Sequence, residues 1–443
     1  MQLWHLTPDA PRLPHRVSPT EHVRLIIGTW PIESGQSVWV TYYVESPGGT
    51  SAEGRSEAVW QRNEGENSYW QVELGAFAQA ERVTYTVHSR SLAGESNGTP
   101  VTFRVGPKLY LALLWHQHQP MYKDTAHPVQ AGSYIHPWVR FHAIRDYYSM
   151  AALVAEHPDV HLTINLTPVL LWQIEDYIER SATDRLLELT LKPAEALNRK
   201  EREEVLSGYF DADWHNQIFP HPRYKELFAQ RRERHPFTVQ DLRDLQMWFN
   251  LAWFGKEFRD GEVKLVTGET ATARRFIEQE RDFSVSDLEE MIAEQYKIMR
   301  AIIPLHRQLQ EGGQIEILTT PFYHPILPLL IDTDHATLDR PGASYPHRFA
   351  YPEDAESQVR LAAEDYRQRF GQPLRGMWPA EGAVSQSALP LFVRHGVCWL
   401  ATDRGVLARS GQWGYNADDP NILCQPYRAE EGENAIAVFF RDT

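Results

Sequence analysis

The sequence predicts an α/β protein in which an all-β sandwich is followed by a (β/α) barrel. Two observations lead to this fold class. From Glu21 to Val105 short alternating apolar and polar runs are separated by turn residues, whereas after Gly106-Pro107 apolar stretches alternate with long helical segments. The length of 443 residues and the hydrophobic content of 42% allow two or three domains of this size.

The first part of the chain is interpreted as an extension, residues 1–20, and an immunoglobulin-like sandwich, residues 21–106. Several short strands spaced by Gly, Ser, Asn and Pro turns are typical of a sandwich. The predicted strands are VRLII, SVWVTYYV, YWQVELG, RVTYTVHSR and VTFRV.

Residues 107–443 are predicted to form the barrel domain. Thr238 to Asp241 and Ser286 to Glu289 have the pattern of helix N-terminal caps ahead of amphipathic segments, which indicates helices that face a core. The predicted strands are LYLALLW (109–115), VHLTINL (160–166), QIEILT (314–319), RGMW (375–378), VCWLAT (397–402) and AIAVFF (435–440).

Charge and composition argue against some classes of partner. The formal net charge is −15 and the pI is near 5.7, so nucleic acid and acidic membrane surfaces would be repelled.

No apolar stretch has the length of a signal peptide or a membrane span, and two cysteines are too few for a disulfide framework. Cys398 is expected to pack as a small apolar residue. A cytoplasmic location is therefore expected, and the oligomeric state stays open.

Polar residues follow the predicted strands at their carboxyl ends, where the reactive groups of such barrels stand. We therefore expect them to share one face of the domain. They are His116, Gln117, His118 and Gln119 after the first strand, Tyr323 and His324 after QIEILT, Glu381 after RGMW, Asp403 after VCWLAT, and Arg441 and Asp442 after AIAVFF.

These segments also resemble the motifs of glycoside hydrolase family 57, in the family's order and from Leu109 onward. LLWHQHQPMY is similar to its His-Gln-Pro motif, GGQIEILTTPFYHPILPLL to its second motif, GMWPAEG to its third, and VFFRD to the start of its fourth. Three further stretches, HPWVRFHAIRDYYSMA, TINLTPVLLWQIEDY and DLRDLQMWFNLAWF, resemble the amylopullulanase and α-amylase branch.

The resemblance implies a retaining α-glucan hydrolase acting on starch or glycogen through a covalent glycosyl-enzyme, with α-1,6 bonds as a second linkage beside α-1,4. Glu381 would be the nucleophile and Asp442 the acid/base, held protonated by burial and by the nearby negative charge. No cofactor and no metal is required. The expected substrate-binding residues are His118, Gln119, Glu316, Trp378, His116 and Tyr323.

In the family a helical segment follows the fourth motif, whereas this sequence stops at Thr443. The resemblance therefore implies a truncated chain, that is, an incomplete (β/α)7-type barrel whose C-terminal helical part is missing.

The same residues are compatible with three other functions. Transglycosylation, as in a 4-α-glucanotransferase or a branching enzyme, uses the same intermediate. His-x-His after the first strand, with Asp442 after the last, is also how a zinc amidohydrolase would begin and end its metal site. A non-catalytic α-glucan-binding protein is a third alternative. In the sandwich, Trp39, Trp60 and Trp70 are either a platform for sugar rings or core residues.

Overall fold

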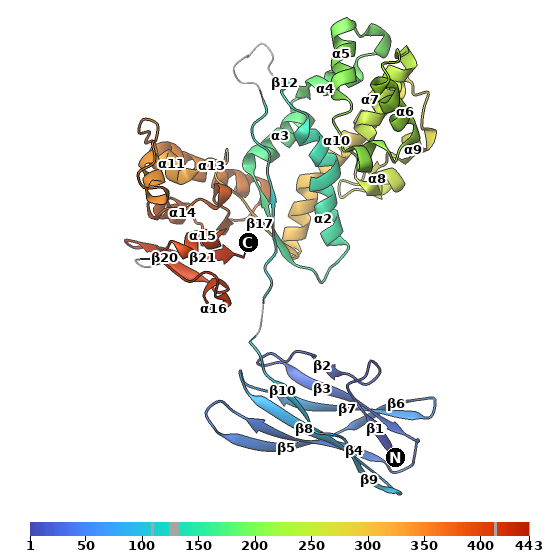
Figure 1. Cartoon of the computed structure of the whole chain (residues 1–443), viewed down its shortest axis with the longest axis vertical. Helices are drawn as coiled ribbons and strands as arrows, with labels where there is room; N and C mark the ends of the chain where they lie inside the picture. The colour runs from blue at the N-terminus through green and yellow to red at the C-terminus, as the bar shows by residue number, and fades with distance from the viewer. Residues whose placement is uncertain (108–109, 124–132, 412–413, 443) are drawn as a thin grey trace. The chain divides into compact units, whose positions relative to one another are not determined.

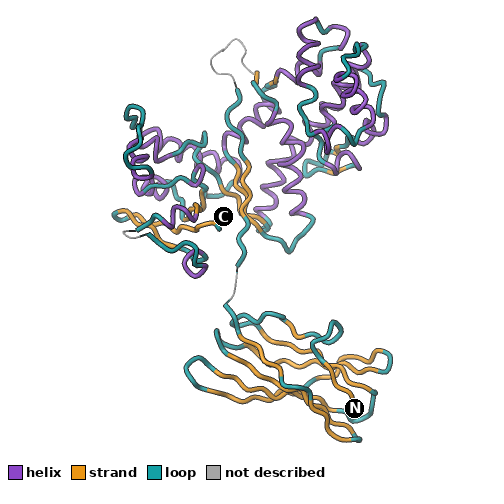
Figure 2. Tube along the Cα trace, viewed as in Figure 1, coloured by secondary structure: helices purple, strands orange, loops and turns teal. Residues whose placement is uncertain are grey.

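The computed structural model describes residues 1–107, 110–123, 133–411 and 414–442, so Leu109, the first residue of one predicted strand, lies outside it. The chain divides into two compact units, Met1–Leu111 (unit 1) and Ala112–Thr443 (unit 2). Unit 1 is built from strands, and the long helices belong to unit 2 (Figure 1, Figure 2). None of the helices in the described residues combines the length and the apolar character needed to cross a bilayer.

Unit 1 is a sandwich of two antiparallel sheets. One has the order β1-β3-β7-β6 with β2 also on β3, and the other the order β10-β8-β4-β5 with β9 also on β8. The strands are β1 Gln2–Trp4, β2 Arg12–Leu13, β3 His22–Trp30, β4 Ser37–Glu45, β5 Ser51–Glu57, β6 Val59–Glu64, β7 Asn67–Ala76, β8 Arg82–Ser91, β9 Gly94–Asn97 and β10 Val101–Arg104.

Alternation places one apolar face of each sheet in the sandwich core, as Val83, Tyr85 and Val87 of β8 illustrate. All five predicted strands are confirmed. Five further strands, β1, β2, β5, β6 and β9, were not predicted. Almost all residues of β5 and β6 are exposed, so these two strands lack the buried side of the alternating pattern.

The three tryptophans of the sandwich differ in exposure. Trp39 is only 8% exposed because the guanidinium groups of Arg55 and Arg90 cover its ring on the outer face of β4. The indole N–H of Trp70 donates to Thr29, whereas Trp60 is 51% exposed on β6. Only Trp60 of the three presents a largely open ring.

Unit 2 contains two sheets whose strands carry the polar residues singled out in the sequence. The first is parallel, with the order β11-β13-β17, and the second has the order β18-β19-β21-β20, in which only β20 is antiparallel. The strands are β11 Leu114–Gln117, β12 Ser133–Tyr134, β13 Leu162–Leu166, β14 Thr183–Asp184, β15 Val263–Lys264, β16 Thr270–Ala271, β17 Ile315–Leu318, β18 Gly376–Met377, β19 Trp399–Asp403, β20 Tyr427–Glu431 and β21 Asn434–Arg441.

A single parallel bridge between Thr319 and Met377 joins the two sheets. The six parallel strands therefore follow one another in sequence order, which is the order of a (β/α) barrel. Among the described residues β11 and β20 lie at the two edges, and no pairing closes the ring. The α/β class is confirmed, and closure into a (β/α)7 barrel stays a prediction.

Helices connect the parallel strands and cover them. α2 and α10 lie beside β11, β13 and β17, and α4 to α9 form an insertion between β13 and β17 (Figure 1). The helices are α1 Trp138–His142, α2 Tyr148–Ala155, α3 Pro168–Glu179, α4 Arg185–Leu191, α5 Arg199–Gly208, α6 Pro222–Arg232, α7 Val239–Leu251, α8 Lys256–Asp260, α9 Arg274–Gln279, α10 Val285–Glu311, α11 Leu327–Ile331, α12 Ala336–Asp339, α13 Pro352–Phe370, α14 Leu389–Arg394, α15 Arg404–Ala408 and α16 Pro420–Leu423.

Three local expectations need correction. Strand β11 begins at Leu114 and runs to Gln117, so His116 lies inside the strand rather than after it. Helix α10 is capped by Ser284 with Asp287, not by Ser286, whose hydroxyl donates to Glu290 instead. Cys398 is exposed, because it precedes β19 at the surface rather than lying in the core.

Candidate active site

Three histidines from two strand ends stack on one another and form what we call the imidazole cluster: His116, His118 and His324. His116 lies in β11, His118 follows that strand, and His324 follows β17. The ring centroids of His118 and His324 are 4.0 Å apart, and those of His116 and His324 are 5.3 Å apart. The cluster therefore stands at the carboxyl ends of the first parallel sheet.

Strand β13 and the residue that follows it contact two of these rings. Asn165 is paired with His116 across the parallel ladder, is fully buried, and places its side-chain nitrogen 2.7 Å from Nδ1 of His116. An amide nitrogen only donates, so Nδ1 of His116 accepts and its Nε2 carries the proton. The hydroxyl oxygen of Thr167, two residues after Asn165, lies 3.4 Å from Nδ1 of His118.

The imidazole cluster is neutral at pH 7. Burial lowers the pKa of His116 and of His118 to about 4, and the neighbouring His324 ring adds to the effect. Burial also lowers the pKa of His324, against a smaller opposing influence of the Glu381 carboxylate. Each neutral ring can donate one hydrogen bond and accept another, which suits sugar hydroxyl groups better than charged ligands.

Glu381 stands next to the cluster on the turn that follows β18. Its carboxylate oxygen Oε1 lies 3.9 Å from Nδ1 of His324, and its side chain is 72% exposed. Its backbone has φ +55°, a left-handed conformation that costs a residue with a Cβ roughly 1 kcal/mol. Such an outlier at the end of a strand is the kind of strain found at functional sites.

Trp378 forms an apolar wall between the two sheets. It is 7% exposed, its backbone N–H donates to the carbonyl of Thr319 at 2.9 Å, and its ring centroid is 6.3 Å from that of His116. The guanidinium carbon of Arg441 lies 5.5 Å from the same ring. Trp378 thus links the imidazole cluster to the end of β21.

Asp442 follows β21 and turns toward a different partner. Its Oδ1 accepts from Arg404 at 3.2 Å, its side chain is 75% exposed, and Arg404 also pairs with Asp418. From the sequence, Asp442 was expected to be buried next to a second carboxylate. The structure instead surrounds it with solvent and an arginine, because α15 begins with Arg404 beside the end of β21.

The remaining predicted residues are placed in three different surroundings. The amide of Gln119 is engaged at both ends, donating to Tyr147 and accepting from Tyr122. Tyr323 is 52% exposed. Glu316 lies on β17, three residues before Thr319, and Thr319 is paired with Met377, the residue before Trp378. Glu316 is therefore separated from Trp378 by roughly 10 Å along the strand direction.

The structure therefore brings together four of the eight predicted residues, His116, His118, Trp378 and Glu381. His324 and Asn165 also belong to this group and were not among the predicted site residues. The position of His324 after β17 was a usable signal, whereas Asn165 needed the strand register to be known.

The cluster does not have the geometry of a metal site. In the part of the chain that the structure describes, no three His, Cys, Asp or Glu side chains are arranged to hold a metal ion. The rings of His118 and His324 are nearly parallel, at 21°, so their nitrogen atoms do not converge on one point. What the arrangement offers is an exposed carboxylate beside neutral hydrogen-bonding rings and an aromatic wall.

Comparison with protein families gives two matches. Residues 112–443 match a model described as glycosyl hydrolase family 57, and residues 7–70 match one described as Lmo2446-like, N-terminal. The isomaltosyltransferase of Sporosarcina globispora is 42% identical over 84 residues, which cover 19% of this chain and 7% of that one.

Solved structures give matches of low similarity. An α-amylase from Thermotoga maritima is 15% identical with a TM-score of 0.39, over 75% of this chain and 45% of that one. A branching enzyme from Pyrococcus horikoshii is 18% identical with a TM-score of 0.39, over 75% and 47%. The cycloalternan-forming enzyme from Listeria monocytogenes is 30% identical with a TM-score of 0.22, over 24% and 10%. The chain spans less than half the length of each of these relatives.

Proposed function

Because this chain belongs to glycosyl hydrolase family 57, we propose that residues 107–443 are a retaining α-glucan hydrolase of the amylase or amylopullulanase type. The strands of unit 2 are then consecutive strands of a (β/α)7-type barrel. The observation that carries the proposal is the position of Glu381, an exposed carboxylate in a left-handed turn at a strand end, beside the imidazole cluster.

Glu381 and Asp442 are the proposed catalytic pair. Strands β18 and β21 flank β19, so their axes are separated by roughly 10 Å, a span that two acidic side chains can bridge from opposite sides of a sugar. A retaining mechanism needs the two carboxyl groups about 5 Å apart. Asp442 would therefore have to turn from Arg404 toward Glu381 when substrate binds.

The reaction has two balanced steps. Glu381 attacks the anomeric carbon and forms an ester while the glycosidic C–O bond breaks, and Asp442 gives its proton to the leaving oxygen. In the second step Asp442 takes a proton from water, the water oxygen attacks the anomeric carbon, and Glu381 leaves as a carboxylate.

The neighbouring residues bind and orient the sugar in this proposal. His116 and His118 would form hydrogen bonds with hydroxyl groups of the sugar, and the ring of Trp378 would form the apolar wall of the site. Gln119 acts through Tyr122 and Tyr147, because its amide is already engaged with both. Tyr323 offers an exposed ring for a more distant glucosyl unit.

Water is the favoured acceptor over a second sugar. The side chain of Glu381 is 72% exposed, so an ester on its carboxylate would be open to solvent. An enzyme that transfers or branches has to keep water away from this intermediate. Hydrolysis is therefore the first candidate activity, and 4-α-glucanotransfer or branching is the second.

Product analysis tests the proposal. The chain is incubated with amylose, pullulan and maltotriose, and reducing ends and oligosaccharide lengths are measured for the wild type, Glu381→Gln and the control Glu431→Gln on the exposed strand β20. We expect new reducing ends that Glu381→Gln lowers by roughly 10³-fold or more, with Glu431→Gln unchanged. Longer products without new reducing ends would favour transfer. Binding of glucan without any product would favour a non-catalytic protein.

A further inference from the structure

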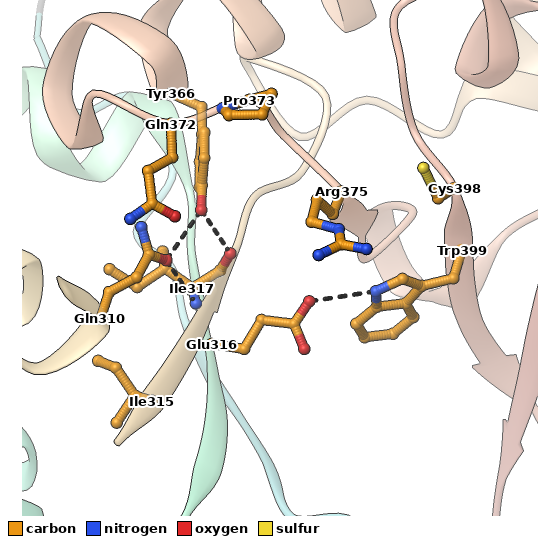
Figure 3. A pocket seen from close by; sticks show the side chains of 10 residues that line it. All are labelled: Gln310, Ile315, Glu316, Ile317, Tyr366, Gln372, Pro373, Arg375, Cys398 and Trp399. Carbon is orange, nitrogen blue, oxygen red and sulfur yellow. Dashed lines mark hydrogen bonds between the residues drawn. The ribbon is translucent and has the colours of Figure 1, made fainter. Parts of the chain in front are cut away.

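A polar cavity lies at the amino ends of the strands in unit 2, away from the imidazole cluster. Its volume is about 420 Å³, within the range of ligand pockets. It is lined by residues of β17, by residues that precede or begin β18 and β19, and by the ends of α10 and α13 (Figure 3). Its residues are Gln310, Ile315, Glu316, Ile317, Tyr366, Gln372, Pro373, Arg375, Cys398 and Trp399. We call it the lower cavity.

The lower cavity exists because β17 and β18 pair only at Thr319 and Met377. Toward their amino ends the two strands separate, and side chains rather than backbone hydrogen bonds occupy the space between them. Glu316 from β17 and Trp399 from β19 reach across this gap, where the indole N–H donates to Oε1 of Glu316 at 3.2 Å (Figure 3).

Trp399 is held in one position by its surroundings. A Cβ on Gly376 would lie 2.3 Å from the indole Cε2 atom, so this ring packs directly on the glycine backbone. The ring of Phe439 meets it edge to face at 5.8 Å. With its N–H bound to Glu316 as well, the indole is a fixed aromatic surface that loses little conformational entropy when a ligand binds.

Two hydrogen-bond donors in the lower cavity lack partners. The side-chain nitrogen of Gln310 is buried without one, while its oxygen accepts from Tyr366 and from the backbone N–H of Ile317. In the described residues neither a hydrogen bond nor an ion pair engages the guanidinium of Arg375, although the carboxylate of Glu316 lines the same cavity. Both groups are therefore available to a ligand.

These groups define the chemistry of the ligand. An anion would meet the carboxylate of Glu316, and a cation would meet the guanidinium of Arg375. A neutral ligand with several hydroxyl groups satisfies both, because a hydroxyl donates to a carboxylate and accepts from a guanidinium or an amide. The fixed indole adds an apolar surface against which a sugar ring can pack.

We propose that the lower cavity is a second glucosyl-binding site, separate from the site around Glu381. The choice of an α-glucan rather than another polyol rests on the proposed function of unit 2. Catalytic residues follow the carboxyl ends of the strands, whereas the lower cavity opens at their amino ends. Binding there would hold a polysaccharide without taking part in bond cleavage, and would raise its local concentration at the enzyme.

The two cysteines of the chain provide the test. Cys398 lines the lower cavity and Cys424 lies outside it, and both are exposed. Alkylation of each thiol by iodoacetamide is followed by mass spectrometry with maltotriose, or with glycerol at equal concentration as the solvent control. We expect maltotriose at ten times its dissociation constant to slow alkylation of Cys398 about tenfold and to leave Cys424 unchanged.

Two arginine variants show where the sugar binds. Arg375→Met should abolish the protection of Cys398, whereas Arg428→Met on the exposed strand β20 should retain it. Protection should also persist in Glu381→Gln, because the lower cavity does not contain the nucleophile. Equal alkylation of Cys398 in maltotriose and glycerol would overturn the inference, as would protection that survives Arg375→Met. If Cys398 is protected but the wild type hydrolyses no glucan, the proposed function is contradicted and the second binding site is supported. If the wild type hydrolyses glucan but Cys398 is not protected, the proposed function is supported and the second site is contradicted.

Discussion

His324 and Glu381 face each other across the two sheets of unit 2, and both have left-handed backbones. Nδ1 of His324 lies 3.9 Å from Oε1 of Glu381, with φ values of +59° and +55°. The distance is too long for a hydrogen bond, and the imidazole is neutral because burial lowers its pKa. The ring therefore lies beside the carboxylate without neutralising its charge, as the proposed attack of Glu381 on the sugar requires.

The strain at Glu381 predicts an effect on stability. Glu381→Gly and Glu381→Ala both remove the carboxylate, but only glycine relieves the left-handed backbone. Glu381→Gly should be more stable than Glu381→Ala by about 1 kcal/mol, measured by urea unfolding. Both variants should be inactive on amylose. Equal stability of the two would show that this turn carries no strain.

Replacing His324 tests its role as a positioning residue. His324→Ala removes the ring that faces Glu381 and leaves the carboxylate free to rotate. We expect kcat on amylose to fall up to about 100-fold while KM changes little, because a small displacement of a reacting group has this effect. His335→Ala, at an exposed histidine bonded to Ser387, is the control. A rise in KM at constant kcat would assign His324 to substrate binding instead.

The buried pair of Arg140 and Asp184 predicts a large loss of stability. Arg140 is fully buried, with its Nε 3.0 Å from Asp184 and its Nη1 2.9 Å from Asn250. Arg140→Met leaves the Asp184 carboxylate buried without its cation and should lower the free energy of unfolding by about 3–5 kcal/mol. The double variant Arg140→Met/Asp184→Asn should recover part of this loss. An equally unstable double variant would contradict this explanation.

His306 predicts a pH dependence of stability. This residue of α10 is fully buried, its Nδ1–H donates to the carbonyl of Ile302 at 2.9 Å, and burial lowers its pKa to about 4. In the unfolded chain His306 is protonated below its ordinary pKa of 6.5, whereas in the folded chain it is protonated only near pH 4. The stability that depends on a neutral His306 is therefore fully present above pH 6.5 and is lost as the pH falls toward 4.

The corresponding measurement compares the wild type with His306→Leu by urea unfolding at pH 7 and pH 5. The wild type should lose about 2 kcal/mol more than the variant between these two pH values. Other histidines with a lowered pKa, such as His221, contribute equally to both proteins and cancel in the difference. Identical pH dependence would place a proton on His306 in the folded state.

The sequence predicted the parts of the site that depend on strand ends. His116, His118, Trp378 and Glu381 meet because the carboxyl ends of parallel strands lie at one edge of a sheet. Side-chain partners were harder to predict. Asp442 pairs with Arg404 and Glu316 with Trp399, because these contacts depend on where β17 and β18 separate and where α15 begins.

The first residue of a helix can also be hard to predict from the sequence. The segment before α10 contains two overlapping cap patterns, Ser284 with Asp287 and Ser286 with Glu289, and nothing local decides between them. The structure uses the first, with reciprocal hydrogen bonds between Ser284 and Asp287. For α7 only one pattern is present, Thr238 with Asp241, and the prediction of its start is confirmed.

Trapping the covalent intermediate tests the proposed role of Glu381 as the nucleophile. The chain is treated with an activated fluorinated α-glucosyl donor that forms the ester faster than water cleaves it, and the labelled peptide is sequenced by mass spectrometry. We expect one glycosyl group per chain, attached to Glu381 and absent in Glu381→Gln. A glycosyl group on any other residue, or products of inverted anomeric configuration without a trapped intermediate, would contradict it.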